Sequence, residues 1–480
     1  MRTILPALLV ALLASHSYAQ DPDPDPDPDP DPDPDPHYQP HPPASNFAGA
    51  PAPNRAHNLV RDDRNSARHL LWVPRAVLFP IKWGLWTVFA PLRGAMYGYD
   101  RYQISERFKI IFFNDEQTFG IYPVALAETG FGLNFGGRVV HKDLFGHGER
   151  ATLRASYGGQ FKQLYRASFK SGELISRHNA LVLEADFDIE ANARFFGIGN
   201  RDAVDNDVAP SGSNPTALAT RTSFRQDIVR VAVGYERALA EPLTLSVSGA
   251  YRHRSFEDPE GSRGEPLADI YDPTRVLGYD EGVENVYGEL SLTYDSRRQA
   301  HMWAWGFGTG ARIDAFVGYT KSVDGYEHDF VRYGLDVQRL IPLYTGDRVI
   351  ALRAYTEGIS SKRGDTPFVE LPRLGGPLLL RGYSRDRFRD RIAMLGTAEY
   401  QYPLARNVWA FFFVDSGRVF NTYSDVELAD FRLGYGFGLQ THSQDAFQSR
   451  VHVASSTDGG LLFSLSFDPV FQVGARTERK

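Results

Sequence analysis

The segment Leu181-Val-Leu-Glu-Ala-Asp-Phe-Asp-Ile-Glu190 alternates apolar and acidic side chains with a period of two. Every odd-numbered residue in it is apolar, and the even positions from Glu184 onward are all acidic. Successive side chains of an extended strand point to opposite faces, so one face here is apolar and the other is charged. The pattern predicts a β-strand at Asn179–Glu190 that separates an apolar environment from a polar one.

The same alternation recurs along the chain, for example at Val229–Tyr235, Leu243–Tyr251 and Leu290–Tyr294. A β-sandwich can also show it, because the solvent face of a sandwich is polar. Repetition over about 350 residues without helical segments favours a transmembrane barrel, whose apolar face meets lipid and whose polar face lines the lumen. We count sixteen candidate strands, and therefore predict an all-β fold: a 16-stranded antiparallel transmembrane β-barrel at residues 118–467, with a polar tail at 468–480.

Composition agrees with an all-β protein rich in turns: 13% of the 480 residues are aromatic, and 44 are glycine. The formal charge is −7, and the eight aspartates between Asp21 and Pro36 alone contribute −8. The rest of the chain is close to neutral, which argues against nucleic acid as a partner.

The first nineteen residues are typical of a cleaved secretory signal peptide. Arg2 gives a basic start, Ile4–Ala14 is apolar, and Ser17-Tyr-Ala19 is a small-x-small cleavage site. A signal peptide at 1–19 and strands in place of a spanning helix predict a location in a bacterial outer membrane.

Residues 20–58 are expected to form a disordered linker. Asp21 to Pro36 consists of eight Asp-Pro repeats, which cannot pair as a strand or continue a helix. A fully extended polyproline conformation would span roughly 50 Å at about 3.1 Å per residue. The acids could bind calcium, but a solvated spacer is the simpler interpretation.

A tryptophan-rich segment at 66–96 follows the linker. Its apolar run contains Trp72, Trp83 and Trp86 but is interrupted by prolines and by Arg75 and Lys82, so it does not fit a spanning helix. We expect a short interfacial helix that lies in the membrane plane or against the mouth of the barrel. A helix packed on a soluble core is the alternative.

A second distinctive segment is Leu374-Gly-Gly-Pro-Leu-Leu-Leu-Arg-Gly-Tyr383. Gly375 and Gly376 free the backbone on one side and Gly382 on the other, which predicts a long loop with a fixed tip. The two apolar segments that follow each carry one acid among aromatics, Glu399 and Asp415. We expect Arg381 to pair with both.

These residues resemble the BamA/TamA surface-antigen superfamily of outer-membrane barrels, which insert or translocate proteins. The loop is similar to the family's Arg-Gly-aromatic motif, carried here by Leu374, Gly375, Gly376, Arg381, Gly382 and Tyr383. Thr397-Ala-Glu-Tyr400 and Phe413-Val-Asp-Ser-Gly417 resemble the two strand motifs that follow it, and Phe195–Asn200 and Thr293–Arg297 also recur in such barrels. The resemblance spans roughly Phe119 to Phe467.

The resemblance implies that the loop folds into the lumen and that Arg381 reaches Glu399 and Asp415 there. By parity Phe411 and Phe413 point inward with Asp415, and Gly417 shares that face. The family's transporters carry periplasmic POTRA domains, whereas no αβ module fits between Ala19 and Gln117. We therefore expect a short form that lacks POTRA domains and works with a separate periplasmic or membrane protein partner.

Two classes of function remain open. The first is protein or lipid insertion, translocation or assembly, with the seam between Phe119–Glu128 and Leu461–Phe467 as a lateral gate. A disulfide across the seam would test it, for example Val124→Cys with Ser464→Cys if the register brings these two residues together. The second is a passive channel or structural barrel without that activity. We find no Gly-x-Ser-x-Gly, His-Glu-x-x-His or phosphate-loop motif, and predict no enzyme, no cofactor and no metal site.

Overall fold

The computed structural model describes residues 107, 110–129, 131–159, 161–200, 221–261, 264–301, 304–326, 328–343, 348–405, 408–427, 431–442 and 447–466. The predicted signal peptide, linker, tryptophan-rich segment with Trp72, Trp83 and Trp86, and polar tail lie outside these residues.

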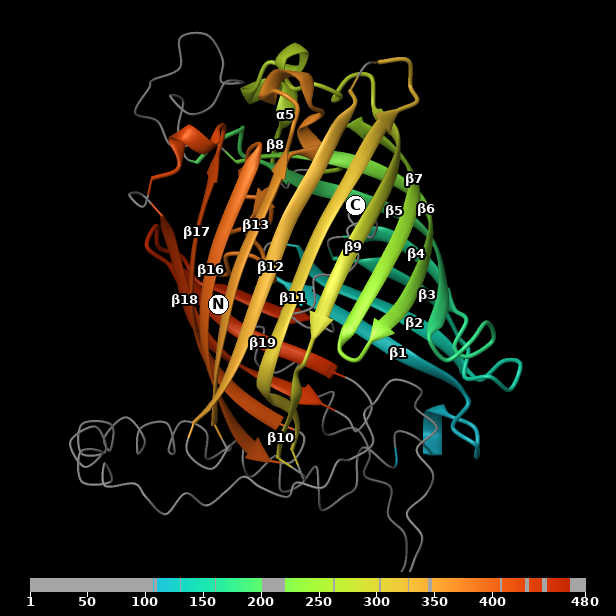
Figure 1. Cartoon of the computed structure of the whole chain (residues 1–480). Helices are drawn as coiled ribbons and strands as arrows, with labels where there is room; N and C mark the ends of the chain where they lie inside the picture. The colour runs from blue at the N-terminus through green and yellow to red at the C-terminus, as the bar shows by residue number, and fades with distance from the viewer. Residues whose placement is uncertain are drawn as a thin grey trace, which may run out of the picture. The chain divides into compact units, whose positions relative to one another are not determined.

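Sixteen antiparallel strands form one closed sheet, which confirms the predicted fold (Figure 1). They are β1 (Phe119–Glu128), β2 (Gly132–Lys142), β3 (Arg150–Gly158), β4 (Phe161–Lys170), β5 (Asn179–Phe195), β6 (Thr222–Ala240), β7 (Leu243–Glu257), β9 (Val283–Asp295), β11 (Ala304–Ser322), β12 (Phe330–Leu343), β13 (Arg348–Ile359), β16 (Ile392–Ala405), β17 (Val408–Phe420), β18 (Arg432–His442), β19 (Phe447–Ser456) and β20 (Leu462–Ser466).

The remaining elements are short and lie in the connections. Four are strands: β8 (Glu265–Pro266), β10 (Arg298–His301), β14 (Arg373–Leu374) and β15 (Phe388–Arg389). The helical turns are α5 (Leu267–Ile270), η2 (Pro273–Arg275), η3 (Arg363–Asp365), η4 (Phe368–Glu370) and η5 (Tyr423–Asp425). No helix among the described residues has the length and apolar character needed to cross a membrane.

The alternation seen in the sequence sorts the side chains between the two faces of the sheet. Apolar residues such as Leu183 and Val231 are 42% and 54% exposed on the outer face. Charged residues such as Asp186 and Arg230 are buried on the inner face, where they form an ion pair. Burial of charge inside the barrel requires this pairing, because a lone charge away from water is costly.

Strand β5 runs five residues beyond the predicted end at Glu190. The register shifts between Glu190 and Ala193, and pairing with β6 then resumes as far as Phe195 and Thr222. Such a bulge interrupts the period of two, which is why the alternating pattern did not reveal the extension.

The barrel closes where β1 meets β20, and this seam has little pairing among the described residues. Ala127 lies opposite Leu465 and Glu128 opposite Ser464, so the seam has two paired positions, whereas β1 and β2 share ten. Val124 and Ser464, named above for a disulfide, do not lie opposite each other in this register. Thr129 extends the contact: its amide donates to the Phe463 carbonyl at 3.0 Å, and its hydroxyl accepts from the Phe463 amide at 2.7 Å.

Strands β5, β7 and β13 end at the same end of the barrel, which we call the loop end. An apolar cluster lies there and includes Phe195, Phe224, Leu267 and Phe368. Phe368 packs edge-on against Phe195 and Phe224 at centroid distances of 5.5 Å. This cluster fixes the base of the long connection between β13 and β16, on which the candidate site is built.

Candidate functional site

The connection 360–391 between β13 and β16, called here the inner loop, folds back into the lumen, as predicted. Its strands β14 and β15, of two residues each, pair with each other and hold the two halves of the inner loop together. At the turn out of β14, Gly375 and Gly376 have φ values of 113° and 97°, which a side chain would strain. The tip then presents Arg381 to the barrel wall.

Arg381 binds both predicted acids, which come from neighbouring strands. Its Nε and Nη2 donate to the Asp415 carboxylate of β17, each at 2.8 Å, and Nη1 donates to Glu399 Oε2 of β16 at 2.8 Å. The Arg381 amide also donates to Asp415 at 2.8 Å. All three side chains are at most 1% exposed, so each charge depends on its partners.

Other lumenal groups complete this pairing. Phe413 lies under the Arg381 guanidinium, 3.5 Å from ring centroid to Cζ, an arrangement that stabilises a cation. Thr397 donates to Asp415 at 2.9 Å, and Gln401 donates to Glu399 at 2.9 Å. Arg450 of β19 gives Glu399 a second cationic partner. The loop tip therefore joins a network that reaches from β16 to β19.

Glycines on the wall and in the inner loop allow the loop and the wall to approach closely. A Cβ added at Gly434 of β18 would lie 1.7 Å from the Arg381 carbonyl oxygen, and one at Gly382 would lie 2.1 Å from the Ser455 carbonyl. Gly417 of β17 makes room for the side chains of Leu374 and Leu380, which would lie 3.1 and 3.3 Å from an added Cβ. A larger residue at these positions would separate the loop from the strands.

Tyr383, the last residue of the predicted motif, is buried against Phe388 with ring centroids 5.1 Å apart. Its hydroxyl is 3.1 Å from the Thr457 hydroxyl, in the turn between β19 and β20. Leu374 joins Tyr383 in the apolar cluster beneath the hairpin. All the predicted loop and strand residues therefore lie together in the lumen.

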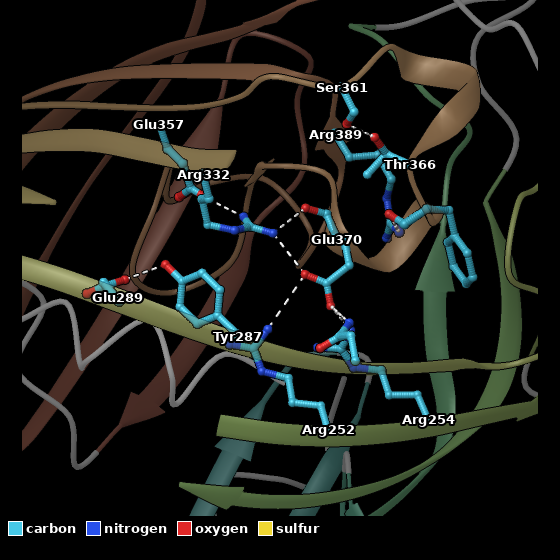
Figure 2. Close-up of polar contacts among 12 residues, drawn as sticks. Arg252, Arg254, Tyr287, Glu289, Arg332, Glu357, Ser361, Thr366, Glu370 and Arg389 are labelled. Atoms are coloured by element: carbon cyan, nitrogen blue, oxygen red, sulfur yellow. Dashed lines mark hydrogen bonds and ion pairs between the residues drawn. The ribbon is translucent and has the colours of Figure 1, made fainter. Parts of the chain in front are cut away.

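A second ion cluster holds the base of the inner loop on a different region of the wall (Figure 2). Glu370 of η4 lies between Arg332 of β12 on one side and Arg252 and Arg254 of β7 on the other. Arg254 donates to Glu370 Oε1 at 2.5 Å and Arg332 to Oε2 at 2.9 Å, while Asn285 of β9 donates at 3.1 Å. These three strands are thus tied to one carboxylate.

The charges around Glu370 decide its ionisation. Burial opposes the charged form, but Arg254, Arg252 and Arg332 outweigh it and hold the pKa of Glu370 well below its usual value. A depressed carboxyl pKa contributes stability above the unfolded value, and the contribution is lost as the pH falls toward the folded pKa. The cluster therefore stays ionised at neutral pH.

No pattern in the sequence indicated this cluster. The alternation of β7 places Arg252 and Arg254 on its polar face, but nothing in the local pattern connects them with Glu370, more than a hundred residues away. Nor did the sequence indicate what Phe195–Asn200 contacts. In the structure Asn200 bonds both backbone groups of Val419 in β17, at 2.7 and 3.0 Å, and the Gly199 amide donates to Arg389 of the inner loop at 2.8 Å.

The described residues of the chain contain no group of three or more histidine, cysteine, aspartate or glutamate side chains arranged to hold a metal ion. His253, which parity places on the outer face, is 48% exposed there. The lumenal clusters are pairs of arginine with carboxylate, an arrangement that positions segments and holds them.

Comparisons with known proteins point to one superfamily. A model of the Omp85 superfamily domain matches residues 143–452, well over half of the chain. Curated protein sequences give no significant match.

Among solved structures, BamA from Haemophilus ducreyi lacking POTRA domains 1-3 aligns with a TM-score of 0.51 and 14% identity, covering 72% of this chain and 69% of that one. CdiB from Escherichia coli aligns at 0.47 and 11%, covering 72% and 62%. CdiB from Acinetobacter baumannii aligns at 0.43 and 12%, covering 72% and 59%.

The BamA alignment supports the fold, and the domain match supports the family. The match begins at the turn after β2 and ends in β19, so it includes the inner loop and the strands that bind it. An apolar outer face and a charged lumen are what a lipid-embedded barrel requires. The chain belongs to the Omp85 superfamily and is an outer-membrane β-barrel.

Proposed function

We propose that this barrel inserts, translocates or assembles protein, or lipid, at the outer membrane by opening its seam. The observation that carries the proposal is the sparse pairing of β1 with β20, two positions against ten between β1 and β2. Fewer backbone hydrogen bonds lower the free energy needed to separate neighbouring strands. An opened seam would present strand edges and a path from lumen to lipid.

Locking the seam tests this proposal. Ala127 and Leu465 are partners in register, and directly opposed residues bring their Cβ atoms close enough for a disulfide. We expect Ala127→Cys with Leu465→Cys to abolish assembly under oxidising conditions and to restore it when reduced. The measurement is the outer-membrane proteome of cells that carry the variant as their sole copy, with and without reductant.

The matched control keeps one cysteine and moves the other. Ala127→Cys with Leu133→Cys crosslinks β1 to β2, which are already paired along their length. This variant should remain active when oxidised. Equal activity of the oxidised seam variant and the oxidised control would refute the proposal.

We propose further that a separate periplasmic or membrane protein works with the barrel, as the resemblance described above implies. The tagged barrel, purified from its native membrane in mild detergent, should retain that protein in stoichiometric amount, as identified by mass spectrometry. A barrel recovered alone would argue against a stable partner.

A structural or passive barrel is the second candidate function. It is favoured by the buried ion clusters that hold the inner loop to β7, β12, β16 and β17, because a loop fixed so firmly suits a static closure. This function requires no seam opening. It therefore predicts that the oxidised seam variant behaves like wild type.

A further inference from the structure

The inner loop also touches the seam itself. Arg385, four residues beyond the Arg381 anchor, donates from Nη2 to Glu128 Oε2 at 2.6 Å. Glu128 is the last residue of β1 and the partner of Ser464 in β20. One of the two paired positions that close the barrel is thus held from inside by the loop.

The loop contacts the other side of the seam as well. Tyr383 meets Thr457 in the turn that leads into β20, and Gly382 lies against the backbone of Ser455 in β19. A pocket between the loop and the seam is lined from both sides, by Glu128, Tyr383 and Ser464 among others. Residues 381–385 therefore contact β1 on one side of the seam and, on the other side, β19 and the turn that leads into β20.

We propose that Arg385 and Glu128 form a latch that couples the position of the inner loop to the seam. While Arg381 holds the tip in the lumen, Arg385 keeps the end of β1 beside β20. When the tip leaves, the latch must break, and the seam loses its inner support. The two are positioning residues, and the proposal rests on seam opening as the working step of the proposed function.

Other charged groups surround Arg385 and Glu128, and they decide which substitution is suitable for testing the latch. Arg385 also faces Asp386 and Glu190, and Glu128 also faces Arg194. Arg194 donates to the Thr129 carbonyl at 3.4 Å and stacks on Phe131 at 3.9 Å, so it supports the β1–β2 turn from β5. Charge reversal would create new repulsions, so the isosteric Glu128→Gln is the cleaner change.

Hydrogen exchange of the purified barrel measures the seam without any client. We expect Glu128→Gln to speed exchange of the amides in 127–129 and 462–466 by roughly five- to thirtyfold, the factor for a lost contact of moderate strength. Exchange at the Arg381 anchor should stay unchanged. Arg385→Gln should act like Glu128→Gln, and the two changes together should add little.

The matched control is Arg373→Gln. Arg373 pairs with Asp386 at 2.9 Å, with exposure similar to that of the Arg385–Glu128 pair, but this pair lies wholly within the inner loop. Its loss should leave seam exchange at the wild-type rate. Equal seam exchange in Glu128→Gln, Arg373→Gln and wild type would overturn the latch.

Coupling between the inner loop and the seam can be measured by combining two substitutions. Releasing the tip with Arg381→Ala should speed seam exchange in the wild-type background but add nothing once Glu128 is glutamine. Simple additivity of the two changes would show that the tip affects the seam by a route other than the Arg385–Glu128 pair, and would also overturn the latch. Neither result depends on the assembly assay, so failure of the latch is distinguishable from failure of the proposed function.

Discussion

Arg381→Ala is expected to release the loop tip and to raise hydrogen exchange across residues 376–386 by about a hundredfold or more. Removing one partner of a buried ion pair costs about 3–5 kcal/mol, which corresponds to a local opening equilibrium shifted by about two to nearly four orders of magnitude. Asp415 would lose both guanidinium bonds, whereas Glu399 would keep Arg450. The stranded Asp415 should therefore account for most of the loss.

A double variant distinguishes the cost of leaving the Asp415 charge without Arg381 from the cost of losing the contact itself. Arg381→Ala with Asp415→Asn removes both charges and leaves an amide that can still bond Thr397. We expect it to recover some of the protection that Arg381→Ala loses. An Arg381→Ala barrel with wild-type exchange at the tip would contradict the role given to this pair, and a double variant worse than the single would contradict the stated cause.

The fold could be predicted from the sequence because its main signal is local. In β17 the run Phe411-Phe-Phe-Val-Asp415 alternates in burial as parity requires, with Phe411 and Phe413 buried and Val414 half exposed on the outer face. The same rule applies to each strand independently. Sixteen strands could be counted without any knowledge of how they pair.

Pairing over long distances could not be predicted in this way. The seam register depends on how far each of sixteen strands is staggered against the next, so a small error anywhere moves the closing pair; hence Glu128 and not Val124 meets Ser464. The contact of Arg381 with Glu399 and Asp415 was expected through a family motif. No motif led to Glu370 or Arg385. Arg254, which binds Glu370, and Glu128, which binds Arg385, each lie more than a hundred residues away along the chain.

Glu370→Gln combined with Arg381→Ala is expected to open the lumen to ions far more than either change alone. Glu370 fixes the base of the inner loop to β7 and β12, and Arg381 fixes its tip to β16 and β17. With one anchor left, the loop remains tethered across the lumen. The combined loss frees it, so the increase in conductance should exceed the sum of the two single increases.

The Glu370→Gln change alone should remove only part of the contact between the base of the inner loop and the wall. Glutamine at 370 keeps the shape of the side chain but loses the charge that Arg252 and Arg254 share, while Arg332 retains Glu357. The base of the inner loop should therefore loosen on the β7 side. Planar-bilayer recordings would compare the conductance of the wild-type barrel, the two single variants and the double variant. Arg363→Gln serves as control, since its partner Asp390 belongs to the same loop. Strictly additive conductances would mean that the two anchors hold separate segments, and that the inner loop is not a single plug.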